Sequence, residues 1–220
     1  MDTSAARKAI FSRIRKAQQR PPEPSAAELA EARAYLASSS PGPRPDIGND
    51  LVGRFRQQAE RTSQTTDTVQ SLEGVPAAAA RYLSGLGAAP AAIAWETMSS
   101  LDWQQAGLEV EFRPPVDKDL VGITGCFCAI AETGTLMLLS GSETYASAAL
   151  LPETHIAVIP VSRIVRSMED AFALAKKERG ELPRATNFIS GPSRTGDIEQ
   201  TIVLGAHGPY RVHLILVHGT

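Results

Sequence analysis

The stretch that most constrains the fold is Gly122–Leu139, in which two apolar runs flank a short polar break. Apolar runs of this length, bounded by turn residues, are typical of strands that are buried on both faces. The break runs from Glu132 to Thr135 and contains a carboxylate, two hydroxyls and a glycine. Burying Glu132 without a partner would cost several kcal/mol. We therefore predict either a solvent-exposed turn at Glu132 or a compensating partner beside it.

The chain around this stretch alternates between strand-like and helix-like patterns. Such alternation predicts βαβ units and an α/β fold, with a mainly parallel sheet and helices on both faces. Asp46 is expected to cap the first helix of this part. Strand patterns fall at residues 65–71, 91–94, 108–112, 120–123, 154–159, 186–189, 202–204 and 212–217, and helical patterns at 46–59, 75–86, 99–105, 144–151 and 167–180.

Residues 1–45 have a different character. Two helical patterns, at 4–19 and 25–36, are separated by a proline-rich segment and followed by a serine- and proline-rich linker. We interpret residues 1–45 as a helical arm that lies on a neighbour, so a homo-oligomer formed through this arm is expected. Residues 46–220 are interpreted as the α/β domain. The basic residues of the first pattern precede no apolar block, which argues against a secretory signal.

Composition excludes several classes of function. The formal net charge of −2 argues against a nucleic-acid partner and against a basic membrane-surface role. No apolar run approaches the roughly 18 residues that a membrane span needs. With two cysteines, a disulfide framework is excluded. We therefore predict a cytoplasmic protein without a membrane span.

A glycine-containing loop after the predicted strand 186–189 is the first candidate site. Gly191 permits close approach of the backbone, so the loop amides can form an anion-binding nest. Ser193 adds a hydroxyl, and Arg194 adds a planar fork suited to a carboxylate or phosphate. The alternative is that Arg194 pairs within the loop with an acid such as Asp197. No Walker A or G-x-G-x-x-G pattern supports a nucleotide site.

His207 and the two cysteines have weaker signals. His207 lies in a glycine-flanked turn, where its imidazole can act as an acid or base, or simply bond to the backbone. Cys126 and Cys128 are spaced i and i+2, so on a strand they would face the same side about 6.6 Å apart. That separation is too long for a disulfide, and an iron–sulfur cluster usually takes four cysteines. We expect two small buried side chains and no metal.

Four segments occur in order along the chain: ITGCFCAIAETGTLMLLSG, LLPETHIAVIP, ISGPSRTGDIE and GAHGP. Together they resemble the LUD domain of the lactate utilization protein C family (LutC/YkgG), over about residues 52–217. The resemblance implies a fold similar to the NagB/RpiA/CoA-transferase-like group, with a Rossmann-like parallel sheet and flanking helices. It also implies association with two iron–sulfur proteins that oxidise L-lactate to pyruvate. The iron–sulfur clusters would belong to those partners, so no cofactor is expected in this chain.

The function implied by the resemblance is a non-redox component or accessory factor of lactate oxidation that binds a small carboxylate or other anion. CoA transferases of a similar fold use a glutamate as the nucleophile, so by analogy Glu132 is a candidate base or nucleophile, with His207 as a second catalytic candidate. The alternatives are a stand-alone transferase- or isomerase-like enzyme that uses Glu132, and a non-catalytic ligand-sensing module. Glu132 can instead accept hydrogen bonds from nearby amides or pair with Arg194. The candidate ligand-binding residues are Gly125, Thr133, Gly134, Thr135, Gly191, Ser193, Arg194 and Asp197.

We expect Glu132, Arg194 and His207 to line one pocket. The remaining histidines, His155 among them, are interpreted as structural residues of the strands that contain them.

Overall fold

The computed structural model describes residues 3–21, 23–38, 42–198 and 201–219, without the side chains of Asp197 and Ile198. The chain divides into two compact units, Met1–Arg44 and Pro45–Thr220. The first unit contains α1 (Ser4–Ala17) and α2 (Ala26–Ser38), and neither helix has a buried residue. Ser25 and Glu28 cap α2 reciprocally, because each side chain bonds the backbone amide of the other. No helix in the described part is long and apolar enough to cross a membrane.

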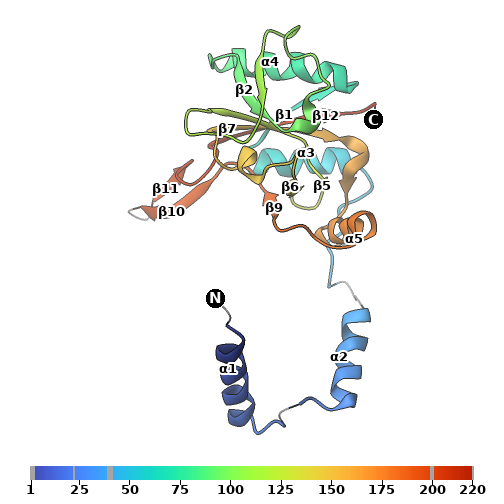
Figure 1. Cartoon of the computed structure of the whole chain (residues 1–220). Coiled ribbons are helices and arrows are strands. Elements are labelled where there is room, and N and C mark those ends of the chain that lie inside the picture. Colours follow the sequence, from blue (N-terminus) through green and yellow to red (C-terminus); the bar gives the residue numbers. More distant parts are fainter. Residues whose placement is uncertain (1–2, 22, 39–41, 199–200, 220) are drawn as a thin grey trace. The chain divides into compact units, whose positions relative to one another are not determined.

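The second unit is built on a six-stranded parallel sheet in the order β1-β12-β7-β4-β2-β3 (Figure 1). These strands contain the apolar runs that the sequence patterns indicated, and their central members are almost entirely buried. The strands are β1 (Thr65–Val69), β2 (Ala91–Ala94), β3 (Glu109–Phe112), β4 (Val121–Thr124), β7 (Thr154–Pro160) and β12 (Arg211–Val217).

The stretch Gly122–Leu139 is shared between this sheet and a second one. After β4 the chain enters β5 (Cys128–Ile130), turns, and returns antiparallel as β6 (Thr135–Leu139). The β5–β6 hairpin forms a four-stranded sheet with β8 (Ile164–Val165) and β9 (Thr186–Ile189), in the order β8-β5-β6-β9. Both faces of β6 are buried, because Leu136 and Leu138 point into one core cluster and Met137 and Leu139 into another.

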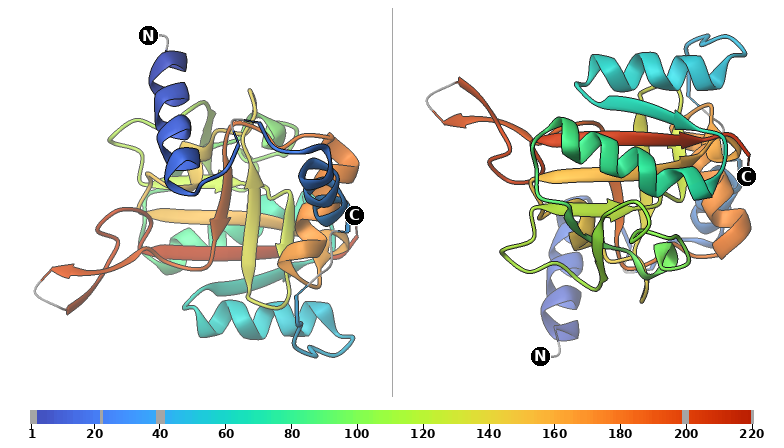
Figure 2. Two further views of the ribbon diagram at one scale, coloured as in Figure 1. Left: turned by 90° about the horizontal axis from the view of Figure 1, so that it is seen from below. Right: turned by 90° about the horizontal axis from the view of Figure 1, so that it is seen from above.

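The elements stack in layers. Helix α4 (Val75–Gly85) covers one face of the six-stranded sheet, as Figure 2 shows, and packs there through Ala78, Ala79 and Leu83. The other face is covered by α3 (Leu51–Arg61) and the four-stranded sheet. Helix α5 (Met168–Arg179) covers the outer face of the four-stranded sheet. The predicted α/β fold, with a parallel sheet and helices on both faces, is confirmed, although the second sheet was not predicted.

Three predicted helices differ from those of the structure. Helix α3 begins at Leu51 and is capped by Asp50, whose side chain accepts a hydrogen bond from the Gly53 amide. Asp46 instead closes a local turn by accepting from the Gly48 amide. Residues 99–105 form turns, because the Asp102 side chain binds a nearby amide and competes with a helix. The helix predicted at 144–151 is reduced to one 3-10 turn at 146–149.

The loop predicted after strand 186–189 is partly a strand. β10 (Arg194–Ile198) pairs antiparallel with β11 (Thr201–Leu204), and the two form a separate two-stranded sheet. In Figure 1 this hairpin projects from the body of the second unit. The predicted nest around Gly191 is therefore confined to the short turn that precedes β10.

Candidate functional site

The strand order creates a crevice at the carboxyl ends of β2 and β4. These strands are neighbours, but the chain leaves β2 for β3 on one side and eventually leaves β4 for β7 on the other. In open α/β sheets, such a reversal of direction marks the place where ligands bind. A cavity of about 640 Å³ lies here, next to Trp95, which follows β2, and Gly125, which follows β4.

The β2 side of the cavity is apolar and held in place. The Trp95 indole is 4% exposed, and its Nε1 donates a hydrogen bond to the carbonyl of Tyr145. Gly125 passes close to Met98, since a Cβ built on Gly125 would lie 3.2 Å from the Met98 methyl group. The packing and the hydrogen bond leave Trp95 little freedom, so this wall is preorganised.

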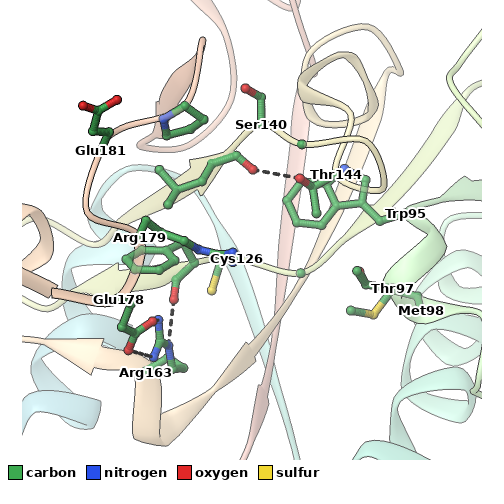
Figure 3. Close-up of a pocket in the computed structure, with 15 residues that line it drawn as sticks. Trp95, Thr97, Met98, Cys126, Ser140, Thr144, Arg163, Glu178, Arg179 and Glu181 are labelled. Carbon is green, nitrogen blue, oxygen red and sulfur yellow. Dashed lines mark hydrogen bonds and ion pairs between the residues drawn. The ribbon is translucent and has the colours of Figure 1, made fainter. Parts of the chain in front are cut away.

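The opposite wall contains a clamp formed by Arg163. Its Nε donates to the Phe127 carbonyl at 2.8 Å, and its two terminal nitrogens bind both oxygens of Glu178 at 2.7 and 3.0 Å (Figure 3). Its guanidinium also lies 4.7 Å from the centre of the Phe127 ring. The hydrogen bonds from Arg163 hold the pKa of the Glu178 carboxyl below its usual range. Arg163 is therefore committed to the protein and is a poor candidate for ligand binding.

The last residue of α5, Arg179, has a different environment. Figure 3 shows its side chain pointing into the cavity, whereas Glu181 lies at the rim and directs its carboxylate away. Within the described ranges no acid forms an ion pair with Arg179, because the adjacent Glu178 is held by Arg163. The cavity thus contains a guanidinium that is available to an anion.

The two cysteines occupy separate environments, so the prediction that they face the same side of a strand is wrong. Cys126 precedes β5, is half-buried and lines the cavity. Cys128 is fully buried beneath α5, with its Sγ 3.8 Å from Met137 Sδ. Burial raises the pKa of the Cys126 thiol to about 12 and that of Cys128 to about 11. Both are neutral at physiological pH, and among the described residues no group of three or more His, Cys, Asp or Glu side chains could hold a metal.

The Glu132–Thr135 turn lies at the far end of the β5–β6 hairpin and does not line the cavity. Gly134 has φ +69° and packs so closely that a Cβ there would overlap the backbone nitrogen of Ala59 in α3. The buried Gln64 donates from Nε2 to the Gly134 carbonyl at 2.8 Å. The turn is therefore anchored to the end of α3, and its conformation requires glycine at position 134.

The loop that follows β9 also packs against the end of α3. Thr135 Oγ1 lies 2.6 Å from Ser190 Oγ and accepts a hydrogen bond from Thr133 Oγ1 at 2.7 Å. Gly191, with φ +96°, packs against the Thr62 carbonyl, and Arg194 donates to Ser63 Oγ. Among the predicted site residues, the structure brings together Thr133, Gly134, Thr135, Gly191 and Arg194, all around residues 62–64.

Other predicted residues lie elsewhere. Glu132 is half-buried, and its backbone amide donates to the Arg166 carbonyl. Within the described ranges its carboxylate forms no ion pair with Arg194, so these two predicted site residues are not partners.

Ser193 belongs to the turn at 205–210, because its amide donates to the Pro209 carbonyl at 2.7 Å. His207 is exposed in that turn. Of the predicted site residues, only Gly125 lines the cavity. The Asp197 side chain lies outside the described residues. Catalytic roles for Glu132 and His207 stay predictions.

Sequence reasoning did not select Trp95 or Arg179. The position of Trp95 could have pointed to the site, since Trp95 directly follows the predicted strand 91–94. Ligands of open α/β sheets bind at the carboxyl ends of strands. The position of Arg179 gave no such indication, because a basic residue in the last turn of an amphipathic helix usually interacts with the helix dipole.

Comparison with known proteins identifies the family. Residues 49–217 match the LUD domain model. The lactate utilization protein C of Exiguobacterium sp. is 38% identical over 125 residues, which cover 56% of this chain and 54% of that protein. That of Bacillus subtilis is 40% identical over 100 residues, or 44% and 42% of the two chains. The chain thus spans about half the length of the curated relatives it matches.

A solved structure supports the fold. The crystal structure of a DUF162 family protein from Deinococcus radiodurans superposes with a TM-score of 0.58 at 23% identity, and covers 76% of this chain and 96% of that one. Residues 49–217, which match the LUD domain model, contain the six-stranded sheet, the four-stranded sheet and the cavity at the ends of β2 and β4. This chain belongs to the LUD domain family.

Proposed function

We propose that this chain is a non-redox component of a lactate-oxidising system, and that it binds a small carboxylate or related anion in the cavity at the ends of β2 and β4. The family assignment and the relatives named lactate utilization protein C support the pathway. Two iron–sulfur proteins are the proposed partners, and they would carry the redox centres. The observation that carries the binding role is the Arg179 guanidinium in this cavity, which forms no ion pair with any acid in the part of the chain that the structure describes.

The chemistry of Arg179 suits a carboxylate. A guanidinium presents a planar fork of donors that matches the two oxygens of a carboxylate and forms strong, charge-assisted hydrogen bonds. Trp95 and Met98 add apolar surface to the same cavity, while Arg179 itself is exposed to solvent. Glu178 does not compete for Arg179, because both of its oxygens are taken by Arg163.

A hydroxyl in the same cavity can orient the ligand. Ser140 Oγ accepts a hydrogen bond from the Ala185 amide at 3.0 Å, so its own proton is free to donate. A 2-hydroxy or 2-oxo acid offers an oxygen next to its carboxylate, and Ser140 is a suitable donor for it. In this proposal the chain binds and orients the acid, and electron transfer takes place on the partners.

Calorimetry with the full-length protein tests the binding role. L-lactate and pyruvate are titrated into the wild type, Arg179→Met and Lys176→Met. The Lys176 variant is the matched control, since it removes an exposed positive charge from the same helix but outside the cavity. We expect Arg179→Met to weaken binding at least tenfold and Lys176→Met to leave it unchanged. Equal effects of the two variants would contradict the site.

Co-purification tests the pathway. The tagged chain is expressed with the two proposed iron–sulfur partner proteins, with and without lactate, and a deletion strain is grown on lactate. We expect the three proteins to associate and the deletion strain to grow poorly. Failure to associate, together with normal growth on lactate, would refute the proposed function.

A transferase- or isomerase-like activity at Glu132 is a second proposal. Its support is the half-buried Glu132 carboxylate, which has no ion-pair partner within the described part of the chain. A carboxylate in such a setting is a candidate base or nucleophile.

A further inference from the structure

We propose that the cavity at the ends of β2 and β4 takes a ligand larger than lactate, in which a planar aromatic ring is joined to an anionic group. The ligand class is that of a nucleoside monophosphate in size and charge. This inference rests on the anion-binding role proposed for Arg179, and it adds the ring as the second determinant of recognition.

The volume of the cavity is the first argument. It measures about 640 Å³. Because a water molecule occupies about 30 Å³ in the liquid, this space corresponds to roughly 20 non-hydrogen atoms. L-lactate has about six non-hydrogen atoms, so roughly two thirds of the cavity would stay empty of ligand. Sites of roughly 300–1,000 Å³ usually bury most of a drug-sized ligand.

The distribution of polar and apolar groups is the second argument. Arg179 and Trp95 approach the cavity from opposite sides in Figure 3. Met98 lies beside Trp95, and Phe127 adds another aromatic ring to the lining. A small carboxylate held by Arg179 would leave the apolar side in contact with water. A ring placed mainly against the half-buried Met98, since Trp95 itself is only 4% exposed, and linked to an anion at Arg179 would cover both sides.

The two aromatic walls of the cavity are rigid. Trp95 is held by its hydrogen bond to the Tyr145 carbonyl, and the Phe127 wall is held by the Arg163 clamp. Preorganised walls favour a rigid planar ligand, because neither partner loses much conformational freedom on binding. The free hydroxyl proton of Ser140 can donate to a polar atom in the middle of such a ligand.

The experiment uses the full-length chain and four probes: AMP, adenosine, ribose 5-phosphate and L-lactate. Adenosine carries the ring without the anion, and ribose 5-phosphate carries the anion without the ring. Binding is measured by calorimetry and by tryptophan fluorescence in a Trp103→Phe background. Because the chain has two tryptophans, Trp95 is then the only one left to report on the cavity.

We expect AMP to bind at least tenfold more tightly than adenosine, ribose 5-phosphate or lactate, and to change the Trp95 fluorescence. Arg179→Met should reduce AMP binding to the level of adenosine, and Lys176→Met should leave it unchanged. Cys126→Phe, which places a ring in the cavity, should weaken AMP more than ribose 5-phosphate. Thermal unfolding of each variant confirms that it is folded.

The outcomes separate this inference from the proposed function. If AMP binds through Arg179 and lactate does not bind, the ring-and-anion ligand is supported and the lactate site is refuted. If lactate binds through Arg179 and AMP binds no better than ribose 5-phosphate, the inference is overturned and the lactate site stands. AMP binding that survives Arg179→Met overturns the inference, and binding of no probe overturns both.

Discussion

The hydroxyl of Thr135 lies 2.6 Å from the hydroxyl of Ser190, and this contact joins two turns that are 55 residues apart in the chain. Both turns contain motif residues that sequence reasoning placed in a ligand site. Their tightest contacts, however, are with the end of α3, through Gly134 and Gly191. The contacts support a structural junction there, while the cavity at the ends of β2 and β4 contains the guanidinium of Arg179.

The junction makes stability sensitive to Gly134. Gly134→Ala should lower the free energy of unfolding by more than about 2 kcal/mol, because the residue has φ +69° and its new methyl group would overlap the Ala59 backbone. Urea unfolding measures the change. Gly85→Ala is the control, since a Cβ at this last residue of α4 meets no atom within 4 Å. The control should be neutral or stabilising by up to about 1 kcal/mol, and equal losses would contradict the junction.

Acid should destabilise the protein through two buried histidines. Burial lowers the pKa of His155 and of His213 to about 4. His155 Nε2 bonds Thr124 Oγ1, and His213 Nδ1 bonds Thr65 Oγ1, each at 2.8 Å. Unfolded histidines bind protons near pH 6.5, so stability that is present above pH 6.5 is lost as the pH falls to about 4. The loss should be about 3 kcal/mol for each histidine.

Urea unfolding at pH 7.5 and 4.5 measures this loss. His155→Gln removes one titrating group but keeps a polar side chain that can bond Thr124, so the change in the free energy of unfolding between the two pH values should shrink by about half. His218→Gln is the control because His218 is exposed. A free energy of unfolding that does not change between the two pH values would show that burial of these histidines has no cost.

The Arg163 clamp should contribute more to the free energy of unfolding than its ion pair with Glu178 alone. Arg163→Met removes the donor to the Phe127 carbonyl as well as the pair with Glu178, and should cost about 2 kcal/mol. Glu178→Gln breaks only the ion pair, whose side chains are 29% and 37% exposed, so it should cost less than about 1 kcal/mol. Thermal unfolding compares the two variants. If both variants lower the stability equally, the hydrogen bond from Arg163 to the Phe127 carbonyl contributes nothing to it.

Glu132→Gln separates the two proposed sites. If the cavity is the binding site, this variant should keep full affinity for anions, because Glu132 does not line it. A catalytic role for Glu132 requires that the same variant fail to restore growth on lactate in a deletion strain. Normal growth with Glu132→Gln would dispose of the enzyme alternative, and weakened anion binding would move the site toward Glu132.

The arm of residues 1–45 should mediate self-association. Ile10 and Ile14 of α1 are 56% and 44% exposed, although both are large apolar side chains. We expect light scattering to give the full-length protein a mass above that of a monomer, and Ile10→Asp to reduce it to the monomer mass. Ser12→Asp introduces the same charge at a polar, exposed position of α1 and should leave the mass unchanged. A monomeric wild type would refute the predicted oligomer.

Local patterns were sufficient for several elements. Strands β2 and β9 have the bounds that the sequence predicts, because each is a short run bounded by turn residues and β2 is apolar throughout. Helix α5 was likewise predicted, since Ser167 caps its start and Gly180, with φ +74°, follows its end. Asp46 was the predicted cap of α3, but Asp50 caps the helix through the Gly53 amide, and Asp46 accepts from the Gly48 amide instead.

The sequence by itself determined the α/β class, most strands and the motifs of the family, because these depend on residues close together in the chain. The tertiary structure decided which segments meet. β1 pairs with β12 from the other end of the domain, and the neighbouring positions of β2 and β4 open the cavity. Such pairings depend on burial across the whole domain, so no local pattern placed Trp95 and Arg179 in one site, or separated both from Glu132.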